Sequence, residues 1–271
     1  MSLRINTNVA ALNAQRNLTI TQSLLAKSLE RLSSGYRINR AADDAAGLAI
    51  SEKLRGQVRG LNQAIRNAQD AVSLIQTAEG ALNETHGIIQ RMRELAVQAA
   101  NDTLTPGDRA ALQTELDNLL SEVDRIANNT QFNTKDLLKT STTFTFQVGP
   151  NAGQVIAVAI SAATAQALGI SGISVSDLTA ASQAIVSLDY ALTTTAEIRG
   201  KLGAAQNRLE FTIANLGVAS ENLSASESRI RDADMALEMV AFSRSLILQQ
   251  AGAAMLAQAN VLPQVVLQLL R

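Results

Sequence analysis

Apolar residues recur every three or four positions along much of the chain. The longest such run steps alternately by four and three residues and consists of Leu54, Val58, Leu61, Ile65, Ala68, Val72 and Ile75. This spacing keeps one face of an α-helix apolar. Because no proline occurs from Asp44 to Asn101, it predicts one helix that is about 80 Å long at 1.5 Å per residue. A globule cannot cover such a helix, so we expect it to lie along partners of similar length.

A 3.6-residue helix drifts against a 3.5-residue repeat, so the apolar face of this helix is expected to move along its length. The residues expected to continue the face are Leu74, Ala78, Ala81, Ile88, Met92, Leu95 and Ala99. Asp43 and Asp44 offer an N-cap and a favourable charge at the start of the helix.

Two shorter helices are predicted on either side of the long one. The first runs from Val9 to Leu32, and Ser33-Ser34-Gly35 ends it because glycine readily forms a left-handed cap. Its thin apolar stripe consists of Val9, Leu12, Leu18, Leu25, Leu29 and Leu32. After the long helix, Thr105-Pro106-Gly107-Asp108 begins a helix that reaches about Asn128, with Thr as cap and Pro at the first position. The short loop predicts an antiparallel hairpin of helices.

The second half of the chain carries a heptad pattern. Its members are Leu188, Thr195, Leu202, Leu209, Leu216, Leu223 and Ile230, with Ala191, Ile198, Ala205, Thr212 and Ala219 three residues after the first five. Gly200, Gly203 and Gly217 lie inside this helix, where glycine is unfavourable, so we expect close approach of backbones there. A thinner stripe follows at Met235, Met239, Phe242, Leu246, Ala253 and Leu256.

Between the helical regions the period changes to two. Phe144, Phe146 and Val148 alternate with polar residues, and a second alternating run lies at 155–160, which together predict a β-hairpin. Residues 161–177 are rich in Ala, Gly and Ser and are expected to form a loop. The predicted fold class is mainly α, with a long antiparallel helical bundle or coiled coil formed by both chain ends and a small central β-hairpin region.

The predicted organisation has two domains. Residues 1–42 plus 236–271 form a discontinuous terminal domain, and residues 43–235 form a trunk with the β element at about 139–177. Two helices with thin stripes are marginal in water by themselves. The ends either fold onto the trunk or become buried only against other copies, and identical head-to-tail contacts that do not close form a filament. The residues expected to make these contacts are Leu25, Leu29, Leu32, Leu246, Leu256, Val266, Leu267, Leu269 and Leu270.

Composition supports helices that pack closely. Hydrophobic residues are 46% and aromatic residues 3% of the chain, and cysteine is absent, which excludes disulfides and thiolate metal sites. The net charge of −1 does not favour nucleic acid as a partner. The sequence contains neither a secretory signal nor an apolar run of transmembrane length, so these features alone indicate a cytoplasmic protein.

Catalytic, cofactor and metal sites are not predicted. His86 is the single histidine, so a pair of histidine ligands and a zinc protease motif are excluded. Asp43 and Asp44 resemble an acidic pair for acid–base catalysis, but a helix cap explains them with fewer assumptions. Gly200 and Gly203 lie in a helical pattern rather than in a phosphate-binding loop.

Several long motifs, in matching order, resemble bacterial flagellin. They are Leu32-Ser33-Ser34-Gly35-Tyr36-Arg37-Ile38-Asn39, Asp43-Asp44-Ala45-Ala46-Gly47, Thr77-Ala78-Glu79-Gly80-Ala81-Leu82, Gln90-Arg91-Met92-Arg93-Glu94-Leu95-Ala96-Val97-Gln98, Ser228-Arg229-Ile230-Arg231-Asp232-Ala233-Asp234-Met235, Ala257-Gln258-Ala259-Asn260 and Val266-Leu267-Gln268-Leu269-Leu270-Arg271. The resemblance covers about residues 1–138 and 185–271. It implies a subunit of the flagellar filament that is secreted by the flagellar type III apparatus without signal cleavage, in place of the cytoplasmic default. The implied partners are further copies of the chain, an export chaperone at the C-terminal tail, and the filament cap and hook-junction proteins, without membrane insertion.

The resemblance also implies recognition by the vertebrate Toll-like receptor for flagellin. The matching positions are Arg91, Leu95 and Glu115; on spacing alone, a core leucine and two solvated charges would be the simpler interpretation. Residues 139–184 leave no room for the large outer domains of longer flagellins. The chain departs from the family at Val261, Leu262 and Val265, where flagellins commonly have polar residues.

Two other readings remain open. A secreted helical translocator or pore former would insert its amphipathic ends into a membrane. A hook–filament junction protein shares terminal motifs with flagellin. An enzyme is the least favoured class.

Overall fold

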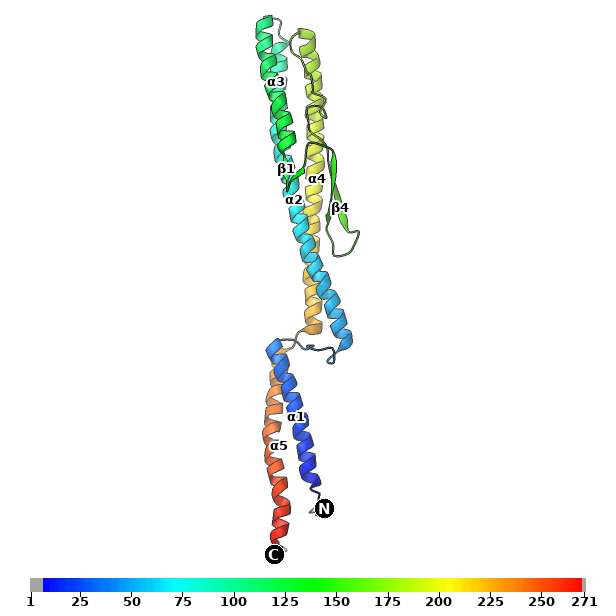
Figure 1. Ribbon diagram of the computed structural model, residues 1–271, viewed down its shortest axis with the longest axis vertical. Coiled ribbons are helices and arrows are strands. Elements are labelled where there is room, and N and C mark those ends of the chain that lie inside the picture. Colours follow the sequence, from blue (N-terminus) through cyan, green and yellow to red (C-terminus); the bar gives the residue numbers. More distant parts are fainter. Residues whose placement is uncertain (1–6, 270–271) are drawn as a thin grey trace. The chain divides into compact units, whose positions relative to one another are not determined.

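The computed structural model of the chain describes the backbone of residues 7–269 and the side chains of residues 7–261. Packing divides the chain into two units, residues 57–221, here called the trunk, and residues 1–56 with 222–271, here called the terminal unit. The division falls inside two long helices, whereas the sequence places it at connectors near residues 42 and 235. The described helices are α1 (Val9–Ser34), α2 (Ala45–Ala99), α3 (Pro106–Asn129), α4 (Leu178–Arg231) and α5 (Met235–Leu269) (Figure 1).

Helices α2 and α4 run antiparallel in the trunk (Figure 1). Three contacts fix their register: Arg93 to Asp189 at 2.6 Å, Arg199 to Glu79 at 3.8 Å, and the hydroxyl of Ser220 to the side-chain oxygen of Asn62 at 3.1 Å. The buried stripe of α2 steps by three and four residues through Leu61, Ala64, Ala68, Ala71, Ile75, Ala78, Leu82, Thr85, Ile89, Met92, Ala96 and Ala99. The facing residues of α4 are Ala181, Ala184, Leu188, Ala191, Thr195, Ile198, Leu202 and Leu209.

This seam confirms the heptads predicted between Leu188 and Leu209 and corrects the expectation for α2. The stripe of α2 keeps a 3.5-residue repeat from Leu61 to Ala99 and does not drift, which is the repeat of a left-handed coiled coil. Ala64 and Ala71 occupy the seam in place of the larger Ile65 and Val72, since small side chains allow the helices to lie close together. Leu74 and Leu95, from the expected second ladder, are buried beside the seam.

Helix α3 packs back along α2 as predicted. Thr105 and Asp108 form a capping box in which each side chain accepts the other's backbone N–H, at 3.3 and 3.0 Å, and Pro106 opens the helix. The guanidinium of Arg109 donates to the carbonyl oxygen of Ala99, at the end of α2, and to that of Asn101 in the loop that follows.

The predicted β-hairpin is present as β3 (Thr142–Gln147) and β4 (Val155–Ile160), paired antiparallel with Phe144 opposite Val158. Its buried face joins the trunk core. A second, unpredicted hairpin joins β1 (Gln131–Phe132) to β2 (Lys135–Asp136) through Asn133 and Thr134, both at positive φ. Both central residues of a tight two-residue turn need this conformation, and Asn-Thr is a weak sequence signal for it.

Residues 161–177 form neither helix nor strand, in agreement with the predicted loop, but they belong to the core. Their buried members are Ala163, Ala165, Leu168, Ile170 and Val175. The backbone N–H of Ala165 donates to Asp124 and that of Val175 donates to Gln113, at 2.8 and 2.7 Å. The segment therefore packs against α2, α3 and α4 and adds its buried side chains to the trunk core.

The expectation of close backbone approach at the α4 glycines is wrong within the chain. A Cβ atom added to Gly200, Gly203 or Gly217 would meet no described atom within 4 Å. The space beside each glycine is open in the isolated subunit.

Candidate self-assembly surface

Helices α1 and α5 of the terminal unit lie antiparallel (Figure 1). The side-chain amide of Asn8 donates to the carbonyl oxygen of Ala259 at 2.8 Å, and Arg31 lies 3.5 Å from Glu238. Partly or fully buried positions recur along α1 at Ala11, Ala14, Leu18, Thr21, Leu25, Ser28 and Leu32, and along α5 at Glu238, Phe242, Ser245, Gln249, Gly252, Leu256 and Ala259. Glu30, Arg31 and Ala241, beside these series, are also partly buried. Both series step by three and four residues, so the pair has its own heptad seam.

Small residues make up half of this seam, which retains only part of each predicted stripe: Leu18, Leu25 and Leu32 on α1, and Phe242 and Leu256 on α5. On α1 the buried position is Ser28, whereas Leu29 is 49% exposed; on α5 it is Ser245, whereas Leu246 is 39% exposed. Gly252 lies close to α1, since a Cβ atom there would be 3.3 Å from a methyl carbon of Leu18. Val9, Leu12, Met235, Met239 and Ala253, which the sequence places on the stripes, are also exposed.

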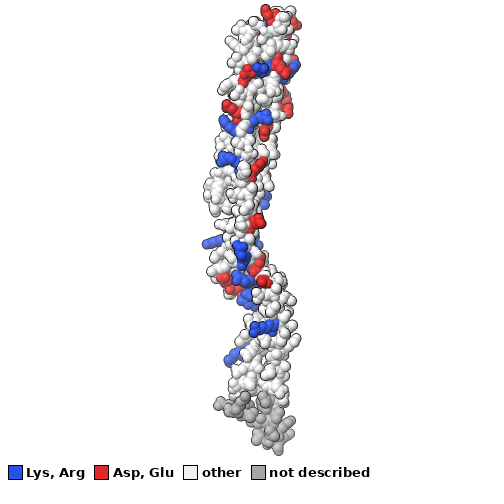
Figure 2. Space-filling view, turned by 180° about the vertical axis from the view of Figure 1, so that it is seen from behind, with Lys and Arg blue, Asp and Glu red and all other residues white. Residues whose placement is uncertain are grey.

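Most of the large apolar side chains of the pair are exposed. Those that are 39 to 69% exposed are Val9, Leu12, Ile20, Leu24, Leu29, Met235, Leu237, Met239, Val240, Leu246, Ile247, Leu248, Met255 and Val261. Lys, Arg, Asp and Glu are sparse on this helix pair and frequent on the trunk (Figure 2). Exposed apolar surface on this scale marks an interaction site.

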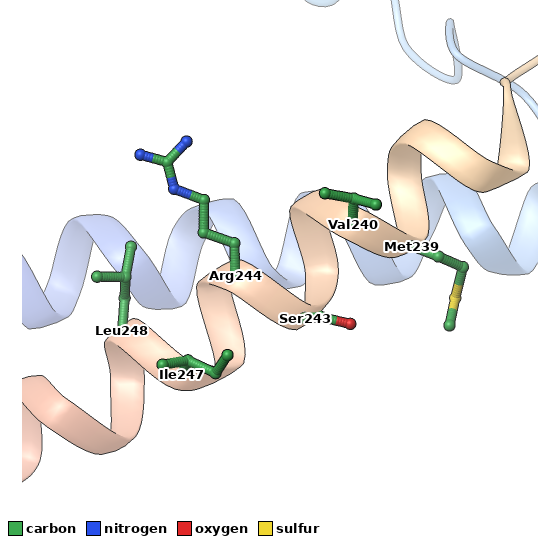
Figure 3. Close-up of a pocket in the computed structure, with 6 residues that line it drawn as sticks. All are labelled: Met239, Val240, Ser243, Arg244, Ile247 and Leu248. Atoms are coloured by element: carbon green, nitrogen blue, oxygen red, sulfur yellow. The ribbon is translucent and has the colours of Figure 1, made fainter.

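A groove of about 470 Å³ lies on this outer face of α5, lined by Met239, Val240, Ser243, Arg244, Ile247 and Leu248. Figure 3 shows Val240, Arg244 and Leu248 projecting to the same side of the helix. These three residues also line a second groove, of about 570 Å³, together with Leu24 and Arg31 of the α1 side. The outer face is therefore hollowed as well as apolar.

The α1–α2 connector crosses the α4–α5 connector through backbone and charge contacts. Gly35 caps α1 at a φ of 74°, and its carbonyl oxygen accepts the N–H of Ala233 at 2.9 Å. The guanidinium of Arg231 lies 4.8 Å from the ring centroid of Tyr36 and 2.6 Å from Glu52. Cation–π contact and ion pair together hold the base of the helix pair.

The residues predicted for self-association fall into three groups. Leu25, Leu32 and Leu256 lie half-buried in the α1/α5 seam, so they hold the pair together. Leu29 and Leu246 lie on the exposed outer face. Val266, Leu267, Leu269 and Leu270 have side chains outside the described residues. Reasoning from sequence missed most of the outer face, and the signal for it was the surplus of large apolar residues in α5.

The positions expected for receptor recognition lie on one side of the trunk. Arg91 is 2.9 Å from Glu115 and 3.0 Å from Glu94, and these hydrogen bonds, that of Glu115 first, raise the pKa of the Arg91 guanidinium. Leu95 is 1% exposed and lies in the core beneath them. The structure thus brings Arg91 and Glu115 together at the surface, whereas Leu95 offers a receptor no side-chain surface of its own.

Within residues 7–269, no group of three or more His, Cys, Asp or Glu residues is arranged to hold a metal ion. In the same range, no helix is long and apolar enough to cross a membrane. His86 is half-buried on α2, with Nε2 3.1 Å from the amide nitrogen of Gln90.

Comparisons with known proteins agree with this arrangement. Residues 5–143 match the family described as bacterial flagellin N-terminal helical region, and residues 185–270 match the bacterial flagellin C-terminal helical region. The chain is 56% identical to flagellin of Halalkalibacterium halodurans over 98% of the chain and 99% of that protein, and 51% identical to flagellin of Bacillus subtilis over 99% and 100%. The crystal structure of Bacillus cereus flagellin aligns with a TM-score of 0.51 and 32% identity, over 56% of this chain and 88% of that one. On this evidence, the chain belongs to the bacterial flagellin family.

Proposed function

We propose that this chain, a structural subunit of the bacterial flagellar filament, assembles by burying the outer apolar faces of α1 and α5 against the α1/α5 pairs of other copies. The observation that carries the proposal is the number of large apolar side chains that this pair leaves exposed. Its most buried inward positions include the small residues Ser28 and Ser245, while most of its large apolar residues face solvent. Full burial of one such large side chain stabilises by about 1.5–3 kcal/mol.

The trunk differs from the terminal unit in having a core of its own. Its seam, its hairpin and residues 161–177 bury large side chains, among them Ile75, Leu82, Met92 and Leu168. The trunk is therefore stable in the free subunit, whereas the terminal unit buries its apolar faces only when a growing filament end supplies neighbouring copies. Repetition of one such contact without closure generates an open helical filament.

Leu29 and Leu246 are proposed to contact other copies directly, and Leu25, Leu32 and Leu256 are proposed to act by holding the pair in shape. Val266, Leu267, Leu269 and Leu270 are proposed to extend the same contacts. The apolar Val261 supports this extension, because it adds to the exposed face of α5.

Export and its partners belong to the same proposal. We expect secretion by the flagellar type III apparatus without signal cleavage, and an export chaperone at the C-terminal tail. The exposed apolar face of α5 supports a chaperone, since it would otherwise promote association before export. Filament cap and hook-junction proteins are the further partners implied by family membership.

The trunk surface at Arg91 and Glu115 is proposed to be recognised by the vertebrate Toll-like receptor for flagellin. The paired guanidinium and carboxylate present a rigid, hydrogen-bonded polar surface. Leu95 is proposed to act beneath this surface by fixing the position of α2.

Seeded filament growth tests the assembly proposal. Purified chain is added to preformed filament fragments, and growth is followed by electron microscopy and light scattering. Wild-type chain should extend the fragments, whereas Ile247→Ser combined with Val240→Ser should not, with helical content unchanged by circular dichroism. Val155→Ser, on the exposed edge of β4, is the matched control and should grow normally. Normal growth of the α5 variant would contradict the proposal, and leakage of lipid vesicles without filament growth would favour a translocator.

A further inference from the structure

Arg244 lies between apolar side chains on the outer face of α5, and no described side chain forms an ion pair with it. Val240 and Leu248 lie one turn before and after it on the same side of α5 (Figure 3). The nearby cations are already matched, since Lys27 lies 2.7 Å from Asp43 and Arg31 lies 3.5 Å from Glu238. Among the side chains described in residues 7–261, none forms an ion pair with Arg244.

Assembly changes the surroundings of this guanidinium. In the free subunit water solvates it, but a neighbour that buries Val240, Ile247 and Leu248 also removes water from Arg244. A guanidinium remains charged when it is buried, so an unpaired one strongly opposes the contact. The neighbour must therefore bring a carboxylate as well as an apolar surface.

An identical helix pair cannot supply that carboxylate from its seam. The described parts of α1 and α5 contain two carboxylates, Glu30 and Glu238, and both are paired, with Arg40 and Arg31. Of the described carboxylates outside ion pairs, three are followed directly in sequence by a large exposed apolar residue: Asp177 before Leu178, Glu210 before Phe211 and Asp234 before Met235. Such a carboxylate matches a groove in which a cation is flanked by apolar side chains.

Asp234 is the one member of this group in the terminal unit. It precedes α5, its carboxylate is exposed, and its contacts are with the backbone N–H groups of Ala236 and Leu237, at 3.0 and 3.2 Å. A carboxylate oxygen retains acceptor capacity beyond these two bonds. Exposed Met235 and Leu237 follow it, so the start of α5 carries the apolar and anionic groups that the groove of a second copy lacks.

We infer that Arg244 forms an ion pair with Asp234 of a second copy, and that this pair sets the register in which neighbouring α1/α5 pairs pack. The inference rests on the proposed burial of the outer face of α5. Apolar surfaces alone slide past one another, whereas one buried polar pair penalises every register in which it is unmatched. The pair thus supplies specificity to a contact whose remaining members are interchangeable.

A double-mutant cycle on the full chain tests this pairing, with the critical concentration for seeded growth as readout. Arg244→Met keeps the length and removes the charge, and Asp234→Asn removes the charge but keeps the helix cap, since Asn caps as well as Asp. Each single variant should raise the critical concentration by about 30-fold, as loss of one partner of a buried pair does. The double variant should raise it no further than either single one, because the contact is lost only once.

Glu210→Gln and Asp177→Asn are the comparison variants, each combined with Arg244→Met. Additive effects are expected for both, and coupling of Arg244 to either would overturn the assignment to Asp234. If Ile247→Ser blocks growth but Arg244→Met leaves it unchanged or improves it, the ion pair is excluded while the proposed function stands. If Ile247→Ser has no effect on growth either, the proposed burial of α5 is contradicted, and the ion pair that rests on it is contradicted with it. Circular dichroism and urea unfolding of each unassembled variant should match wild type.

Discussion

The ammonium nitrogen of Lys27 lies 2.7 Å from one carboxylate oxygen of Asp43, and the other oxygen accepts the backbone N–H groups of Asn39 and Arg40 at 3.2 Å. Asp43 therefore joins α1 to the connector that follows it. The actual cap of α2 is Asp44, which accepts the N–H of Gly47 at 2.8 Å. The hydrogen bond from Lys27 and the backbone N–H of Arg40 are the main causes that lower the pKa of Asp43 to about 2.

This pKa predicts acid sensitivity of the terminal unit. The folded pKa lies below the unfolded value of about 3.9, so the stabilisation is fully present above about pH 5 and is lost progressively as the pH falls through 2. Asp43→Asn should lower the free energy of unfolding at pH 7 by about 1 kcal/mol, a modest amount because Lys27 is half exposed. Urea unfolding at pH 7, 4 and 2.5 measures this. The difference between wild type and variant should be much smaller at pH 2.5 than at pH 7, and a constant difference would contradict the assignment.

Substitutions at the α4 glycines that have open space beside them test the stability of the subunit and its assembly separately. Gly200→Ala and Gly203→Ala should each raise the free energy of unfolding of the unassembled chain by about 0.5–1 kcal/mol, because alanine favours helix and its Cβ meets nothing within 4 Å. Gly252→Ala is the matched contrast, because its Cβ would lie 3.3 Å from Leu18, and it should gain less or lose stability. Chemical denaturation distinguishes these results. If the Gly200 variant is more stable but assembles poorly, another copy approaches that glycine in the filament.

Substitutions at Leu95 and Arg91 should differ in their effect on stability, because one residue is buried and the other is exposed. Leu95→Ala should lower the free energy of unfolding of the trunk by about 2–5 kcal/mol, because it leaves a cavity in the core. Arg91→Ala should leave stability nearly unchanged, because exposed ion pairs contribute little. A cell reporter for the flagellin-sensing receptor should nevertheless lose signal with Arg91→Ala. Undiminished signalling by a folded Arg91→Ala chain would refute recognition at this position, and Arg125→Ala, which breaks another exposed trunk ion pair, serves as control.

Amide hydrogen exchange should distinguish the two units in the unassembled chain. The α1 and α5 amides should exchange faster than those of α2 between residues 61 and 99, because a single seam with few fully buried residues protects the pair. Assembly should slow exchange in α1 and α5 much more than in the α2 core. Equal protection of both regions in dilute solution would show that the terminal unit is already complete.

Local signals in the sequence determined most of the secondary structure. Gly35 ends α1, Thr105-Pro106 opens α3, and the alternation around Phe144 marks β3, because each of these features depends on residues a few positions apart. Heptad spacing likewise determined that the long helices pack lengthwise. The sequence also established the surplus of apolar side chains at both ends. Such a surplus calls for burial against a partner whichever stripe faces inwards.

Only the tertiary structure decided which apolar stripe faces inwards. Ala64 competes with Ile65, and Ser28 with Leu29, and in each case the smaller residue occupies the seam. Hydrophobicity alone favours the larger residue, but the free energy depends on how closely two backbones approach, and that distance is a property of both helices together. For the same reason the register of the helices brings Arg91 to Glu115 of another helix. It leaves Arg244 without an ion-pair partner among the described side chains.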